Sequence, residues 1–202
     1  MEEVPGVGAF SFRAGGFFQN NSAILPVFVE HVVDALSRPG SDQEAPIYLV
    51  DAYCGVGLFA IASASRFQQV VGIELDSQAV AHAHRNAERH GAANCTFLAA
   101  DACAGLRSIS VRKLKGSQTA LLVDPPRSGL DKNMRQALLT MMPQRLVYVS
   151  CDFGTQARDL QELCQEHYRC VSVTPFDLFP QTRHLETVAV LERKAVDSAF
   201  SS

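Results

Sequence analysis

An apolar segment that runs directly into a glycine turn is the feature that most limits the fold of this chain. Residues 47–50 are Ile-Tyr-Leu-Val, and Asp51 and the turn Gly55-Val56-Gly57 follow them. A helix is predicted at 58–65, which makes a strand, turn and helix unit. In open α/β sheets this turn lies at the carboxyl end of the first strand, where small residues let the backbone approach a ligand. We therefore expect a doubly wound α/β sheet with a cofactor site at this strand end.

Further apolar segments of strand length alternate with amphipathic segments along the chain. They are continuously apolar, as expected for parallel strands that are covered on both faces. Strands are predicted at 70–73, 96–98, 120–123, 146–149, 170–173 and 186–191, and helices at 21–36, 131–141 and 155–166. Ser77 is expected to cap an alanine-rich helix that Gly91 terminates. Residues 37–46 are linker-like, and no repeat interrupts the single expected domain.

Composition narrows the class of protein. The 202 residues are 47% hydrophobic and 19% charged, which fits one globular domain. The formal net charge of −3 and a pI of about 6.1 leave no basic footprint, so nucleic-acid binding has to be argued from a site. The six cysteines lack paired CxxC spacing, which predicts no metal site and favours a reducing, intracellular compartment. Without a signal peptide or an apolar run of roughly 20 residues, we expect a soluble protein that binds no membrane.

Acidic residues follow successive predicted strands and point to a nucleoside-containing cofactor. The glycine turn lacks the third glycine of a dinucleotide fingerprint and the lysine of a phosphate loop, which disfavours both of those ligands. Glu74 closes the second strand, about 20 residues after the turn, where a carboxylate can accept from both ribose hydroxyls. Asp101 follows the third strand and could accept from an adenine amino group, although an ordinary turn aspartate explains it as well. Asp124 closes another strand before two prolines that fix the backbone.

A cysteine and a late glutamate suggest covalent chemistry. Cys151 ends the strand predicted at 146–149, and Glu186 begins the last strand. Taken alone, Cys151 fits a small buried hydrophobe and Glu186 fits a surface acid on an edge strand. Taken together, a thiol nucleophile and a carboxylate base constrain both the mechanism and the substrate. The other cysteines are expected to be structural.

Motifs of one enzyme family follow each other in order along nearly the whole chain. They are Phe-Phe-Gln-Asn-Asn at 17–21, Asp-Ala-Tyr-Cys-Gly-Val-Gly at 51–57, Asp-Pro-Pro-Arg at 124–127, Tyr-Val-Ser-Cys at 148–151 and Phe-Pro-Gln-Thr-Arg-His-Leu-Glu at 179–186. In these segments the chain resembles the catalytic domain of the RNA uracil-5-methyltransferases, and most closely the eukaryotic, fungal-type transfer RNA enzymes. The resemblance implies a Rossmann-like, class I S-adenosylmethionine-dependent methyltransferase fold, with a mostly parallel seven-stranded sheet and an antiparallel last strand.

The resemblance also implies roles for individual residues. The implied methyl donor is S-adenosylmethionine, which leaves as S-adenosylhomocysteine. Together with the turn and the strand-end acids, the expected cofactor contacts are Gln19, Tyr53, Gly55, Glu74, Asp101 and Asp124. Cys151 is the implied nucleophile that adds to carbon 6 of uracil, and Glu186 is the implied base that removes the proton from carbon 5. Arg127 is a candidate cation beside the thiol, and Phe17 is either core packing or a face for a flipped-out base.

The implied substrate is a uridine in RNA, first of all the T-loop uridine of transfer RNA, with ribosomal RNA as the alternative. We expect a monomer of one catalytic domain, residues 1–202, whose residues 1–20 form a lead-in. The chain departs from the family in having Asp152 where many members have asparagine, which adds a negative charge beside the thiol. The family's upstream RNA-binding modules, an oligonucleotide-binding barrel among them, are also not expected in this chain, so RNA binding should be weak.

Other functions stay open at this point. A 5-methylcytosine RNA methyltransferase would carry its nucleophile in the motif after the fourth strand, where this chain has Arg127, and is disfavoured. An amino-directed methyltransferase would have an aromatic residue after Asp124-Pro125-Pro126, and none is present. A non-catalytic cofactor-binding or RNA-chaperone module is the alternative from a different class, and the cysteine and glutamate argue against it.

Overall fold

The computed structural model describes residues 1–13, 21, 23–40, 43–165, 167–178, 180–182 and 185–194, and at 109 and 110 it describes the backbone alone. Phe17 and Gln19, two of the predicted site residues, lie outside these residues, as does His184. Within the described part of the chain, no helix is long and apolar enough to cross a membrane.

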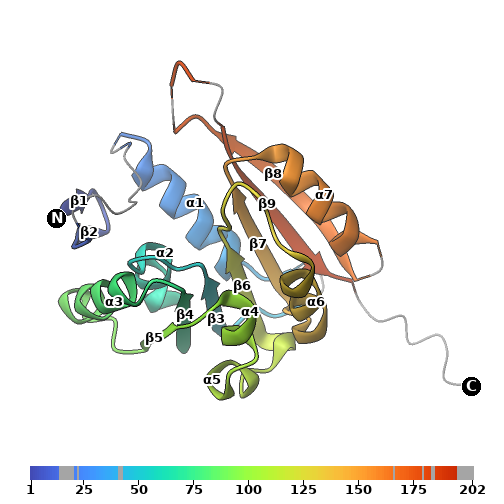
Figure 1. Ribbon diagram of the computed structural model, residues 1–202, viewed down its shortest axis with the longest axis horizontal. Helices are drawn as coiled ribbons and strands as arrows, with labels where there is room; N and C mark the ends of the chain where they lie inside the picture. Colours follow the sequence, from blue (N-terminus) through green and yellow to red (C-terminus); the bar gives the residue numbers. More distant parts are fainter. Residues whose placement is uncertain are drawn as a thin grey trace, which may run out of the picture.

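A seven-stranded sheet runs through the centre of the domain in the order β5-β4-β3-β6-β7-β9-β8 (Figure 1). Its strands are β3 (Tyr48–Ala52), β4 (Gln69–Glu74), β5 (Cys95–Ala99), β6 (Thr119–Val123), β7 (Arg145–Ser150), β8 (Tyr168–Phe176) and β9 (Glu186–Arg193). The strands from β3 to β7 pair in parallel, whereas β9 runs antiparallel to both β7 and β8. The predicted sheet, mostly parallel with an antiparallel last strand, is confirmed.

Helices cover both faces of this sheet, as in a doubly wound fold (Figure 1). On one face lie α1 (Leu25–Ser37), α2 (Leu58–Ala62) and α3 (Ser77–His90), and on the other lie α4 (Ala102–Leu106), α5 (Ile109–Arg112), α6 (Lys132–Met141) and α7 (Phe153–Cys164). Two short 3-10 helices, η1 (Ala64–Arg66) and η2 (Gly116–Gln118), precede β4 and β6. Successive residues of a strand point to opposite faces of the sheet. Leu49 therefore packs in the core under α1, α2 and α3, and Val50 packs in the core on the opposite face.

The parallel strands end together at one edge of the sheet. Ala52 at the end of β3 lies between Ile73 of β4 and Val123 of β6 in the strand register. The segments that follow these strands therefore converge at the edge where doubly wound sheets bind ligands.

A small hairpin at the amino terminus was not predicted by the sequence pattern. It consists of β1 (Glu2–Val4) and β2 (Gly8–Phe10), and it packs beside α3. The fully buried side chain of Asn86 anchors the end of the hairpin, because its Oδ1 accepts from the Ser11 amide at 2.8 Å. Its Nδ2 donates to the carbonyls of Ser11 and Val56, each at 3.0 Å. One side chain thus joins the lead-in segment to the glycine turn.

Helix boundaries differ from the prediction where a different residue caps the helix. The prediction that Ser77 caps α3 is wrong, because the Asp76 side chain accepts from the Gln78 amide at 2.8 Å and Ser77 is the first helical residue. Gly91 ends α3 in the left-handed conformation, as predicted. Helix α1 begins at Leu25 and not at 21, with a proline in its first turn, where a missing N–H costs nothing.

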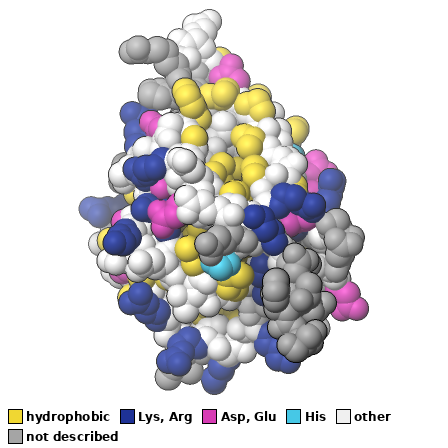
Figure 2. Space-filling model, turned by 90° about the vertical axis from the view of Figure 1, so that its right-hand side faces the viewer, with side chains coloured by type: hydrophobic (Ala, Val, Ile, Leu, Met, Phe, Trp, Pro, Cys, Tyr) yellow, Lys and Arg dark blue, Asp and Glu magenta, His cyan; other side chains and the backbone are white. Residues whose placement is uncertain are grey.

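Strand β8 forms one edge of the sheet and is incompletely covered. Val171 and Val173 are 41% and 52% exposed. Figure 2 shows the side of the molecule to which α7 and β8 belong, where uncovered hydrophobic side chains gather in the upper half and Lys and Arg side chains lie around them. This side therefore presents apolar surface bordered by charged side chains of both signs.

Candidate active site

A cavity of about 910 Å³ opens at the carboxyl edge of the sheet. Among its lining residues are all the predicted site residues that the structure describes: Tyr53, Gly55, Glu74, Asp101, Asp124, Arg127, Cys151 and Glu186. They come from the segments after β3, β5, β6 and β7, from the last residue of β4 and from the first residue of β9. The structure thus brings together residues that are spread over more than half of the sequence.

The glycine turn forms one wall of the cavity and is held against β4. The amides of Tyr53 and Cys54 both donate to the carbonyl of Ile73, each at 2.9 Å. Gly57 caps α2 with φ +88°, a conformation that suits glycine, and a Cβ there would lie 3.1 Å from the Phe97 ring. Gly57 therefore lets the turn pack closely against Phe97, whereas Gly55, which lines the cavity, leaves its backbone open to a ligand.

Glu74 closes β4 and is fixed by two backbone amides. One carboxylate oxygen accepts from the Gly55 amide at 3.0 Å, and the other accepts from the Asp76 amide at 2.9 Å. Each carboxylate oxygen can accept a second hydrogen bond. The side chain is therefore oriented in advance, at the strand end where a ribose would be held.

Asp101 has a structural role as well as a place in the cavity. It caps α4, and its side chain accepts from the Ala104 amide at 3.1 Å. The turn role that the sequence left open is thus present, and the exposed side chain also lines the cavity beside Ala100 and Ala102.

Asp124 lines the cavity together with Glu186, and it also interacts with the buried Asp51, which does not line the cavity. Burial, followed by the charges of Glu186 and Asp51, raises the pKa of Asp124 well above its ordinary range. Burial also raises the pKa of Asp51 to about 7, against a hydrogen bond from the Ala60 amide that lowers it. Asp51 is 1% exposed, and its Oδ1 has no hydrogen-bond partner among the described residues. A cationic ligand in the cavity would favour the ionised forms of Asp124 and Asp51.

Cys151 and Glu186 come from the ends of adjacent antiparallel strands. The register of β7 and β9 ends with Ser150 opposite Thr187, so Cys151 and Glu186 are the next residues along the two segments, and both line the cavity. Glu186 is 4% exposed, whereas Cys151 is half-buried and open to the cavity.

Arg127 lowers the pKa values of both Cys151 and Glu186. Burial and the charge of Glu186 raise the pKa of the Cys151 thiol, whereas a hydrogen bond from the Arg127 side chain and its positive charge lower it. Burial likewise raises the pKa of Glu186, and Arg127 lowers it. The guanidinium therefore favours the ionised forms of a thiol and a carboxyl that repel each other when both are charged.

The charged side chain of Asp152 caps the start of α7. Its side chain accepts from the Thr155 amide at 2.9 Å, and this hydrogen bond holds the pKa of Asp152 below its ordinary value. The charges that act most strongly on Cys151 are those of Glu186 and Arg127. Asparagine and aspartate are about equally good helix caps, so the departure from the family pattern keeps the start of this helix intact.

Sequence reasoning missed a second wall of the cavity. Phe12 and Arg13 from the lead-in, and His82 from α3, also line it. The position of Asn86 on α3 was the available signal, because a buried amide inside an amphipathic helix needs polar partners from another segment. Among the described residues, no group of three or more His, Cys, Asp or Glu side chains could hold a metal ion.

Comparison with known proteins identifies the family of this chain. The model of the tRNA (uracil-5-)-methyltransferase family matches residues 8–194. The chain belongs to this family. It is 39% identical to the tRNA (uracil(54)-C(5))-methyltransferase of Schizosaccharomyces pombe over 191 residues, which are 92% of this chain and 36% of that protein. The Saccharomyces cerevisiae enzyme of the same name is 37% identical over 91% of this chain and 29% of its own length.

A solved structure and a ribosomal RNA enzyme are also similar to the chain. The Pyrococcus abyssi tRNA (uracil-54, C5)-methyltransferase, solved in complex with S-adenosyl-L-homocysteine, has a TM-score of 0.70 and 34% identity over 87% of this chain and 40% of its own. The 23S rRNA (uracil(1939)-C(5))-methyltransferase RlmD of Stenotrophomonas maltophilia is 38% identical over 91% of this chain and 40% of its length. The chain thus spans 29% to 40% of the length of these relatives.

Proposed function

We propose that this chain is the catalytic domain of an S-adenosylmethionine-dependent methyltransferase that methylates carbon 5 of a uridine in RNA. The proposal rests on the observation that a thiol and a buried carboxyl, Cys151 and Glu186, line one cavity with Glu74, at the adjoining ends of β7 and β9. This pair supplies a nucleophile and a base to the same substrate ring, and Glu74 supplies the ribose site of a nucleoside cofactor.

The polar and charged groups in and next to the cavity suit S-adenosylmethionine. The Glu74 carboxylate has acceptor capacity left for the two ribose hydroxyls, and Asp101 lies where it can accept from an adenine amino group. Asp124 and Asp51 have raised pKa values, and a ligand that carries an ammonium and a sulfonium would stabilise their charged forms. When bound, this cofactor supplies the methyl group. Tyr53, Gly55 and, from its motif, Gln19 complete the proposed contacts.

Cys151 would act as the nucleophile and Glu186 as the base. Carbon 5 of uracil is a weak nucleophile, and addition of the Cys151 thiolate to carbon 6 turns it into an enolate carbon that can accept a methyl group. Glu186 then removes the proton from carbon 5, so that the bond to sulfur breaks and the ring double bond returns. A carboxyl with a raised pKa is a stronger base for this step. Arg127, whose charge favours the thiolate, would support the first addition.

Transfer RNA is the proposed substrate, at the uridine that corresponds to position 54. The support is that the two fungal relatives and the archaeal structure carry this position in their names. The similarity to RlmD favours uridine in ribosomal RNA as the second candidate. Lys and Arg side chains around the surface in Figure 2 offer contacts for phosphates despite the net charge of −3. We propose a monomer, because one copy of the chain supplies the thiol, the carboxyl and the cofactor residues.

The test is formation of 5-methyluridine. The chain is incubated with S-adenosylmethionine and either an unmodified transfer RNA transcript or a ribosomal RNA fragment, and the digested nucleosides are analysed by mass spectrometry. We expect 5-methyluridine from the transfer RNA with the wild type and with Cys170→Ala, a control at an exposed cysteine, and none with Cys151→Ala. Product from the ribosomal fragment alone would select the second candidate. Absence of product with both RNAs, while cofactor and RNA are bound, would overturn the proposal.

A further inference from the structure

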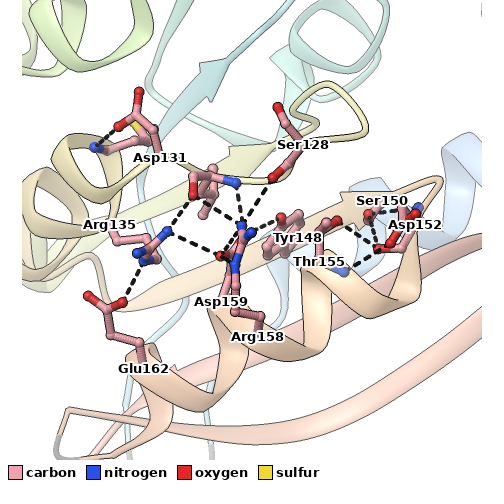
Figure 3. A network of polar contacts seen from close by, with 12 residues as sticks. Ser128, Asp131, Arg135, Tyr148, Ser150, Asp152, Thr155, Arg158, Asp159 and Glu162 are labelled. Atoms are coloured by element: carbon pink, nitrogen blue, oxygen red, sulfur yellow. Dashed lines mark hydrogen bonds and ion pairs between the residues drawn. The ribbon is translucent and has the colours of Figure 1, made fainter.

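The segment that carries Arg127 has no helix or strand of its own, and α7 holds it in place. Residues 124–131 connect β6 to α6, and Arg127 is exposed within this connection. Figure 3 shows that side chains of α7 and α6 point toward this segment and converge on Asp159. Helix α7 begins just after Cys151, so one helix follows the proposed nucleophile and also contacts the segment that carries its cation.

Asp159 is the centre of this network and is fully buried. Its Oδ2 accepts from the Leu130 amide and from the Tyr148 hydroxyl, each at 2.8 Å. Its Oδ1 accepts from Arg158 at 2.8 Å and from Arg135 at 3.3 Å. Two cations and two neutral donors thus satisfy a carboxylate that would otherwise be costly to bury.

The same arginines hold the backbone carbonyls of the segment. Arg158 donates to the Ser128 carbonyl at 3.0 Å, and Arg135 donates to the Leu130 carbonyl. The hydroxyl of Thr155, in the first turn of α7, donates to the carbonyl of Arg127 itself at 3.2 Å. The backbone is therefore fixed at and after Arg127 by donors from two helices.

Gly129 allows the segment to come this close. Its φ is +74°, and a Cβ at this position would lie 2.6 Å from Oδ2 of Asp159 and 2.8 Å from the Arg158 guanidinium. Any larger residue would force the segment away from Asp159 and would also strain the backbone.

We propose that Asp159 is a positioning residue that fixes residues 127–130 of this segment. It does so through the Leu130 amide and through Arg158 and Arg135, and the Arg127 side chain is thereby held against the Cys151 thiol. Its importance for methyl transfer rests on the function proposed above. The placement of Arg127 against Cys151 can be measured without that function.

The experiment measures the rate at which iodoacetamide alkylates Cys151 as a function of pH, with the alkylated peptides resolved by mass spectrometry and Cys103 and Cys170 as internal references. With Asp159→Asn, the rate at neutral pH should fall about threefold to tenfold, because the thiolate loses its cation. A direct charge effect would have the opposite sign, since removal of a negative charge favours the thiolate and speeds alkylation. The direction of the change therefore separates positioning from simple electrostatics.

Two further variants complete the test. In an Arg127→Ala background, Asp159→Asn should cause no additional fall, because the group that it positions is gone. Glu162→Gln is the matched control, since it removes a carboxylate that binds Arg135 at 2.6 Å without contacting the segment, and it should leave the profile of Cys151 unchanged.

If Asp159→Asn does not fold, Gly129→Ala tests whether the segment positions Arg127 against Cys151. It displaces the segment without changing any charge and should slow alkylation of Cys151 in the same way. The proposal is overturned if the folded Asp159→Asn or Gly129→Ala variant alkylates Cys151 at the wild-type rate or faster, or if Asp159→Asn slows alkylation as much without Arg127 as with it. Because the assay contains neither RNA nor cofactor, its outcome is independent of whether the chain methylates uridine.

Discussion

Cys151 and Glu186 both line the cavity at the point where β7 ends and β9 begins, each one residue beyond the pair Ser150 and Thr187. Their position follows from the antiparallel insertion of β9, which brings a residue from the end of the chain beside the carboxyl end of a parallel strand. The negative charge of Glu186 opposes ionisation of the thiol, and Arg127 favours it. The reactivity of the pair is therefore set by three groups from three separate segments.

Replacement of the base separates the two halves of the proposed reaction. With Glu186→Gln, addition of Cys151 should continue while removal of the carbon 5 proton fails, so turnover should fall by roughly 10²-fold or more and a protein–RNA adduct should accumulate. Alkylation of Cys151 by iodoacetamide should become faster, because a charge that raises the pKa of the thiol is gone. Intact-mass analysis and peptide mapping measure both. A variant that turns over at the wild-type rate would exclude Glu186 as the base.

Replacement of the cation should have the opposite effect on the thiol. In Arg127→Ala the pKa values of Cys151 and Glu186 should both rise, since Arg127 lowers each of them. The pH profile of Cys151 alkylation should move to higher pH, and Arg127→Lys should restore part of the shift because it keeps the charge but not the planar donor geometry. If the profile of Arg127→Ala coincides with that of the wild type, Arg127 does not act on the thiol.

Binding of the cofactor should depend on pH. Asp124 and Asp51 have raised pKa values, with Asp51 at about 7, so both lose their protons more readily when a cation binds. The affinity for S-adenosylmethionine should therefore increase from about pH 6 to about pH 8, with proton release. S-adenosylhomocysteine lacks the sulfonium charge and should depend less on pH. Isothermal titration calorimetry measures both ligands, and an affinity for S-adenosylmethionine that falls over this range would contradict the prediction.

Asp51 should also limit the stability of the free protein. A carboxyl whose folded-state pKa is raised binds its proton more tightly when folded. Its contribution to the free energy of unfolding is therefore complete below the unfolded pKa of 3.8 and is lost as the pH rises toward about 7. The pKa difference sets an upper bound of roughly 4 kcal/mol on this loss.

Asp51→Asn keeps an oxygen for the Ala60 amide and removes the buried charge. Urea denaturation should show that the variant is more stable than the wild type at about pH 8 and no more stable at about pH 4, in line with the pKa difference. Asp34→Asn, on the surface of α1, is the control and should show no such difference. Equal stability of Asp51→Asn and the wild type at pH 8 would contradict the raised pKa.

The sheet and most of the cavity could be predicted because they depend on local patterns. Continuous apolar segments specify buried parallel strands, and the carboxyl ends of parallel strands must meet at one edge. Glu74 ends such a strand and Asp124 directly follows another, so their convergence was predictable. Helix caps were less certain, because Asp76 and Ser77 are both good capping residues and adjacent in the sequence.

The remaining parts depend on contacts between distant segments. The hairpin of β1 and β2 has three residues in each strand, too few for a recognisable alternation. Phe12 and Arg13 reach the cavity only because Asn86, about 75 residues later, holds Ser11. The network at Asp159 likewise joins side chains to backbone groups almost 30 residues away, and no spacing in the sequence marks such a contact.

The covalent role of Cys151 in uridine methylation is tested most directly with a transfer RNA transcript that contains 5-fluorouridine. The transcript is incubated with the chain and S-adenosylmethionine, and the protein is analysed by intact-mass measurement. Fluorine cannot leave as a proton does, so the reaction should stop after methyl transfer. We expect a methylated covalent adduct with the wild type and with Cys170→Ala, and none with Cys151→Ala. An adduct that persists in Cys151→Ala, or no adduct from a wild-type chain that binds both cofactor and transcript, would contradict this role.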